Sequence, residues 1–138
     1  MNEYVGQCAC GRIEVRLLSG LSPSQFQPRS DAPTCRFCSE HDGVWISDPN
    51  GTLGLQAAAR TRITRFGSEQ VQFHFCSECD ALVWAIFEDA SKAVGVVRVS
   101  LFESIRAAGP PTVVMSYEEE TVASGRQRRL ARWTPVQR

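Results

Sequence analysis

The stretch Val71-Gln72-Phe73-His74-Phe75-Cys76-Ser77-Glu78-Cys79-Asp80 contains the two features that decide the fold. Its first half alternates apolar and polar residues, which is the pattern of a half-buried β-strand. Its second half places two cysteines three positions apart, and thiolates at this spacing can bind the same metal ion. A strand that ends in a metal-binding turn predicts a β-rich domain that is partly held together by metal.

The same strand pattern recurs on both sides of this stretch. Alternating segments at 13–17 and 53–57, and short or wholly apolar runs at 44–46, 81–87, 94–99 and 113–115, predict further strands. Turn-forming residues separate them, as in Asp48-Pro49-Asn50-Gly51 and Gly109-Pro110-Pro111. We therefore expect a mainly β, mostly antiparallel domain. One short helix is expected near 100–107, with a capping box at Ser100-Leu101-Phe102-Glu103 and an end at Gly109.

Composition excludes several classes of protein. The 138 residues carry 15 basic and 15 acidic side chains, and 43% are hydrophobic, so we expect one globular domain over residues 1–138. Balanced charge indicates no nucleic-acid partner, and no apolar run approaches the roughly 18 residues of a membrane span. The start Met1-Asn2-Glu3-Tyr4 contains no apolar signal, so we expect a cytoplasmic protein with reduced thiols.

The six cysteines come in three close pairs, Cys8-Ala9-Cys10, Cys35-Arg36-Phe37-Cys38 and Cys76-Ser77-Glu78-Cys79. Two such pairs complete a tetrahedral zinc site with four thiolates, whereas a disulfide framework suits shorter secreted chains. Spacing allows three ways to choose the two pairs. The first and third pairs adjoin predicted strands, and rigid strand ends favour them for a structural zinc.

The middle pair differs because a histidine follows it. Cys35, Cys38 and His41 are spaced three apart, so one turn could direct all three at a metal ion with a fourth position open, which is the pattern of a catalytic zinc. The alternatives are a metal-free dithiol for the two cysteines and a surface residue for His41. His74 is expected on the strand face of Cys76, either near the first metal or as an ordinary strand histidine.

Three motifs, in this order, resemble the family of glutathione-dependent formaldehyde-activating enzymes, which includes centromere protein V. They are Gly6-Gln7-Cys8-Ala9-Cys10-Gly11, Pro33-Thr34-Cys35-Arg36-Phe37-Cys38 and Phe75-Cys76-Ser77-Glu78-Cys79-Asp80, and the resemblance covers residues 4 to about 100. The segment 41–49 also resembles a bacterial branch with a histidine after the middle cysteines. Two positions depart from the pattern, Pro33 for a cysteine and Asp80 for a glycine, and Asp tolerates left-handed backbone well.

The resemblance implies a zinc-stapled, tent-like β fold. It implies a structural zinc on Cys8, Cys10, Cys76 and Cys79, and places Cys35 and Cys38 at a second, catalytic zinc, for which His41 would replace the thiolate lost at Pro33. The activity implied is that of a carbon–sulfur lyase acting on a thiol–aldehyde adduct such as S-hydroxymethylglutathione, with glutathione and formaldehyde as partners. The alternatives are a non-catalytic zinc domain that binds a protein or ligand, with only the structural site filled, and a dithiol oxidoreductase using Cys35 and Cys38.

Overall fold

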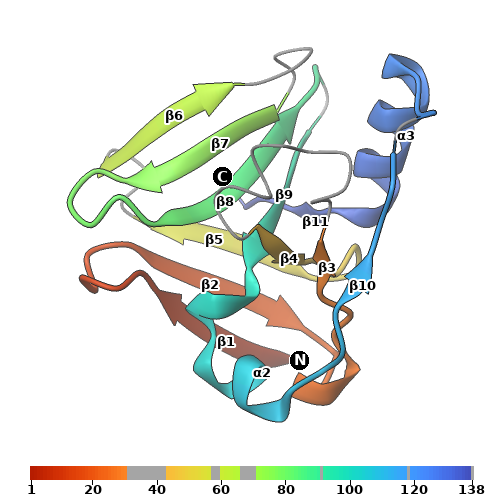
Figure 1. Cartoon of the computed structure of the whole chain (residues 1–138). Helices are drawn as coiled ribbons and strands as arrows, with labels where there is room; N and C mark the ends of the chain where they lie inside the picture. Colours follow the sequence, from red (N-terminus) through yellow and green to blue (C-terminus); the bar gives the residue numbers. More distant parts are fainter. Residues whose placement is uncertain (31–42, 57–59, 66–70, 91, 118, 138) are drawn as a thin grey trace.

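The computed structural model describes residues 1–30, 43–56, 60–65, 71–90, 92–117 and 119–137. A small antiparallel sheet near the N-terminus has the strand order β1-β2-β5 (Figure 1). Its strands are β1 (Asn2–Gln7), β2 (Glu14–Ser19) and β5 (Thr52–Gln56). Side chains alternate along β2, and Val15, Leu17 and Ser19 point into the core.

A larger sheet lies over the small one and has the order β10-β3-β4-β9-β8-β7-β6, with β11 pairing with β9. Its central strands are almost wholly apolar because both of their faces are covered. The strands are β3 (Arg29–Ser30), β4 (Val44–Ile46), β6 (Thr61–Arg65), β7 (Val71–Cys76), β8 (Leu82–Glu88), β9 (Ala93–Arg98), β10 (Val113–Val114) and β11 (Thr134–Pro135). Only β10 and β3 pair in parallel among the named strands of this sheet.

The main core fills the space between the two sheets. Val15, Leu17 and Leu53 of the small sheet pack in one cluster with Trp84 and Val97 of the large sheet. The two sheets open toward β6 like the sides of a tent (Figure 1). The mainly β, tent-like fold expected from the sequence is thereby confirmed, whereas the expectation of a single domain over 1–138 stays a prediction.

The C-terminal segment connects the sheets directly. Strand β11 pairs with β9, and the next residues pair with the small sheet, where Gln137 N–H donates to the carbonyl of Leu53 at 2.8 Å. Beside it, Asp48 is buried: its carboxylate accepts from the Ser19 hydroxyl at 2.5 Å, and its N–H donates to the Thr134 hydroxyl at 2.8 Å. These bonds join β2, the turn after β4, and β11.

The helix expected near 100–107 is confirmed, but its start differs. A 3-10 turn, η3 (Val99–Leu101), precedes helix α2 (Glu103–Ala108), so Ser100 lies in that turn and Phe102 is the N-cap without a side-chain cap. The helix packs one apolar face against the core, where Phe102 and Ile105 are buried. Gly109 ends the helix with a φ of 64°, as its lack of a Cβ allows. A further 3-10 turn, η1 (Pro23–Gln25), contacts α2.

Helix α3 (Val122–Arg132) was not expected from the sequence, because Gly125 interrupts a polar, arginine-rich segment. Thr121 caps it by accepting from the Ser124 amide. The helix packs Leu130 on the outer face of the large sheet, beside Trp133. Two of its four arginines form ion pairs within the chain, Arg126 with Asp89 and Arg128 with Glu120.

Four strands also lacked a clear sequence signal: β1, β6 and the two-residue strands β3 and β11. Strand β1 buries Tyr4 and Gly6, and glycine is needed because a Cβ at Gly6 would lie 2.9 Å from the Phe102 ring. Strand β6 is at the edge of its sheet, so its polar side chains remain largely exposed. None of the helices among the described residues is long and apolar enough to cross a membrane.

Candidate metal centre

The first pair of cysteines lies in the turn between β1 and β2. Gly11 N–H donates to the carbonyl of Cys8 at 2.9 Å, and the Cys8 N–H donates to Ile13 at 3.2 Å, so the turn is closed on itself. Gly11 has a φ of 75°, a left-handed conformation that glycine adopts without a steric penalty. This closed turn therefore holds the side chains of Cys8 and Cys10 close together.

The third pair lies in the turn between β7 and β8, which has the same design. Asp80 N–H donates to the carbonyl of Cys76, and the Cys76 N–H donates to Ala81, both at 2.9 Å. Asp80 has a φ of 59°, so it adopts the left-handed conformation of Gly11 and confirms that aspartate is tolerated at this position. Its carboxylate pairs with Arg62 of β6.

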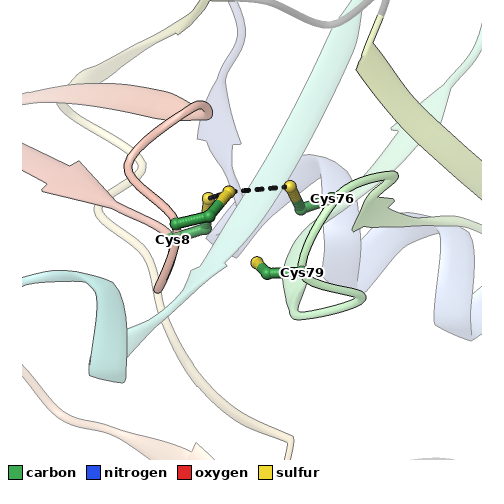
Figure 2. Close-up of side chains that lie close together, drawn as sticks. Cys8, Cys76 and Cys79 are labelled. Atoms are coloured by element: carbon green, nitrogen blue, oxygen red, sulfur yellow. Dashed lines mark hydrogen bonds between the residues drawn. The ribbon is translucent and has the colours of Figure 1, made fainter.

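The two turns bring the four cysteines together from opposite sheets. All four sulfur atoms lie within 4.8 Å of one another, and the Cys10 Sγ is 3.5 Å from the Sγ atoms of both Cys8 and Cys76. Figure 2 shows Cys8, Cys76 and Cys79 turned toward the same small space between the turns. Cys8 and Cys76 are buried against the core, whereas Cys10 is exposed.

This arrangement fits a zinc ion. Zn–S bonds of about 2.3 Å in a tetrahedron place the sulfurs about 3.8 Å apart, close to the spacing observed. Ile13 N–H also donates to the Cys8 Sγ at 3.4 Å, which is the kind of outer contact that orients a metal ligand. The four-cysteine cluster can therefore hold a metal ion. This agrees with the sequence context, which favoured the first and third cysteine pairs as the ligands of one site.

The pKa values of the clustered thiols also indicate a site that favours a bound cation. Burial raises the pKa of Cys8, but the amide of Ile13 and the adjacent thiols outweigh it and lower that pKa to about 6. The amide of Arg12 lowers the pKa of Cys10, but burial and the neighbouring thiols raise it to about 12. Thiolates packed this closely repel one another, so a bound cation is what would allow all four to ionise.

The middle cysteines Cys35 and Cys38, together with His41 and Pro33, lie outside the described residues. Their assignment to a second metal site stays a prediction. The described part of the chain thus provides one complete ligand set of four cysteines.

His74 is buried on the face of β7 that looks toward the small sheet, and Trp84 of the main core lies directly opposite on β8. Its Nδ1 atom is 2.8 Å from the Thr61 hydroxyl. Burial is the main cause that lowers its pKa to about 4, and the charge of Arg65 adds to the effect. Sequence reasoning gave no reason to select Thr61 or Trp84, because neither belongs to a motif.

Comparison with known proteins places this geometry in a family. The chain is similar to the crystal structure of a Rhodobacter sphaeroides protein with a TM-score of 0.60 and 19% sequence identity, and the match covers 80% of this chain and 99% of that one. At this identity the likeness concerns the fold. No curated protein matches the sequence. A family model, glutathione-dependent formaldehyde-activating enzyme, matches residues 3–119, which is most of the chain.

That match takes in both cysteine turns whose four sulfurs meet between the sheets. The chain belongs to the family of glutathione-dependent formaldehyde-activating enzymes.

Proposed function

We propose that this protein is a zinc-dependent carbon–sulfur lyase that joins and separates a small thiol, such as glutathione, and an aldehyde such as formaldehyde. The observation that carries the proposal is the family match over residues 3–119, which includes the four-cysteine cluster. Cys8, Cys10, Cys76 and Cys79 would hold a structural zinc. A reducing compartment such as the cytoplasm would keep these thiols free to bind it.

The reaction itself is a reversible addition. The sulfur of the thiol attacks the carbonyl carbon of formaldehyde, so that a carbon–sulfur bond forms as the π bond of the carbonyl breaks. The carbonyl oxygen takes a proton to replace the one that the thiol gives up, and the product is the S-hydroxymethyl adduct. We assign Cys35 and Cys38, with His41, to the reacting site on the strength of the sequence. A zinc ion held there would lower the pKa of a bound thiol toward neutrality. Cys35, Cys38 and His41 would hold and orient the metal ion to which the substrate sulfur binds.

The test is the exchange rate between formaldehyde and its glutathione adduct, measured by NMR on purified protein at neutral pH. We expect exchange faster than in buffer alone, and a return to the buffer rate in Cys35→Ala. Metal analysis of the same samples should give two zinc ions per chain in the wild type and one in the variant. An exchange rate equal to that of buffer would refute the lyase.

The same samples distinguish the non-catalytic zinc domain. That alternative predicts one zinc ion per chain, unchanged when Cys35 and Cys38 are both replaced by serine, and no acceleration of exchange. Ser39→Ala serves as the matched control, because it alters the same segment and leaves all six cysteines and His41 in place.

A further inference from the structure

A cavity lies on the outer face of the large sheet, at the end formed by β10, β3 and β4 (Figure 1). Arg29 of β3 lines it and is the register partner of Trp45 on β4. Register partners share a face, and Trp45 belongs to the outer cluster against which Leu130 of α3 packs, so Arg29 lies on the face that the helix covers. The volume of the cavity is about 310 Å³, which reaches the range of sites for small molecules.

Two successive hydrogen bonds fix the Arg29 guanidinium at the wall of this cavity. Its Nη2 donates to the Ser47 hydroxyl, and that hydroxyl donates to the carbonyl of Arg132 at 2.9 Å. Ser47 therefore acts both as acceptor and as donor, and it ties Arg29 to the last residue of α3. A guanidinium presents five N–H donors in a planar fork, so a few internal contacts hold it in place without using all of its donors.

Positive charge and apolar surface together define the chemistry of the cavity. Arg132 is the second lining arginine, and none of the described lining residues is acidic. Val113 and Met115 supply apolar surface from one face of the β10 segment, because they are two positions apart and Val113 is the register partner of Arg29. A carboxylate matches the fork of an arginine, and an apolar chain attached to it would match the other part of the lining.

We propose that this cavity is a second ligand site, which binds a small organic carboxylate with an apolar chain of a few carbons. Arg29 and Arg132 pair with the carboxylate, and Val113 and Met115 contact the chain. Arg132 lies beyond residues 3–119, so the family match does not account for the site. The cavity is on the outer face of the large sheet, whereas the four-cysteine cluster lies between the sheets, so the proposal is independent of the lyase.

The two methionines of the chain provide the readout. Met115 lines the cavity, whereas Met1 is 82% exposed at the N-terminus and serves as an internal control. In protein labelled with ¹³C at the methionine methyl groups, hexanoate should shift the Met115 resonance with a Kd on the order of 1 mM and leave Met1 in place. Hexan-1-ol keeps the chain without the charge, and inorganic phosphate keeps a charge without the chain, so each should bind about tenfold more weakly. Met115→Leu assigns the two resonances.

Arg132→Gln removes one charge from the cavity but keeps the backbone carbonyl that holds Ser47, and it should weaken hexanoate binding about tenfold. Arg126→Gln is the matched control, because it removes the same charge from the same helix at a position that is not among the described lining residues, and its Kd should equal that of the wild type. The proposal is overturned if hexanoate leaves the Met115 resonance in place, if phosphate binds as tightly as hexanoate, or if Arg132→Gln binds hexanoate like the wild type. None of these results alters the test of the lyase, which measures exchange with glutathione.

Discussion

The two places where the sheets are joined are built on opposite principles. At one, the turns of β1–β2 and β7–β8 meet through four sulfur atoms, and the contact needs a metal ion to become strong. At the other, β11 and the residues after it bond to both sheets through the backbone, supported by buried Asp48. The comparison shows that the cysteine junction depends on a bound metal ion, whereas the C-terminal junction is formed by hydrogen bonds within the polypeptide alone.

The largest effect should follow from breaking the cysteine junction. Cys76→Ser, or a strong chelator applied to the wild type, is expected to remove the bound metal and lower the free energy of unfolding by at least about 5 kcal/mol, with a fall in the thermal midpoint of roughly 15 °C. The cause is that metal binding contributes directly to folding. Thermal unfolding together with zinc analysis measures both effects.

The matched control for this junction is Glu78→Gln. Glu78 and Arg12 form an ion pair at 3.5 Å between the same two turns, but both side chains are more than half exposed. Solvent screens such a pair, so the variant should keep its zinc and lose no more than about 0.5 kcal/mol. A stability loss in Glu78→Gln as large as that in Cys76→Ser would show that the sulfur cluster is not what joins the turns.

A smaller effect is expected at the C-terminal junction. Asp48→Ala leaves the Ser19 hydroxyl and the Asn50 amide without their acceptor, which should cost about 3 kcal/mol and lower the thermal midpoint by roughly 10 °C. The zinc content should stay at the wild-type value, because this junction is independent of the metal. Asn50→Ala, at an exposed position of the same turn, is the control and should change stability by less than about 0.5 kcal/mol.

Loss of zinc from Asp48→Ala would contradict the independence of the two junctions. That result would mean that the two junctions are coupled, so that weakening one of them also separates the sheets at the other.

The smallest effect concerns Glu120 before helix α3. Its bidentate hydrogen bonds with Arg128 lower the pKa of the carboxyl below the ordinary value. A lowered pKa in the folded state stabilises the protein above the unfolded pKa, and this contribution is lost as pH falls through the lower, folded value. Glu120→Gln should therefore cost about 0.5–1 kcal/mol at pH 7, and the difference from the wild type should disappear in acid.

Chemical denaturation at a series of pH values from 7 to 3 measures this difference. Glu119→Gln, at the adjacent exposed position, is the matched control and should follow the wild type throughout. A cost in Glu120→Gln that stays constant down to pH 3 would show that packing, rather than the ion pair, accounts for it.

The parts of the fold that the sequence predicted are those whose signal is local. Alternation identified strands such as β2 and β7, and the cysteine spacing identified both metal-binding turns, because each depends on residues a few positions apart. Helix α3 escaped detection because Gly125 and the arginines contradict a helical pattern. Its stability comes from packing on the outer face of the large sheet and from ion pairs to Asp89 and Glu120.

The sequence by itself therefore determined the chemistry of this protein: a mainly β chain with three cysteine pairs and the motifs of its family. Only the tertiary structure decided that the first and third pairs meet, since Cys10 and Cys76 are separated by 66 positions and their sulfurs by 3.5 Å. It also decided that His74 faces Trp84, and that the C-terminal residues close the second junction. Pairing of distant segments is set by the packing of two whole sheets, and no short stretch of sequence encodes it.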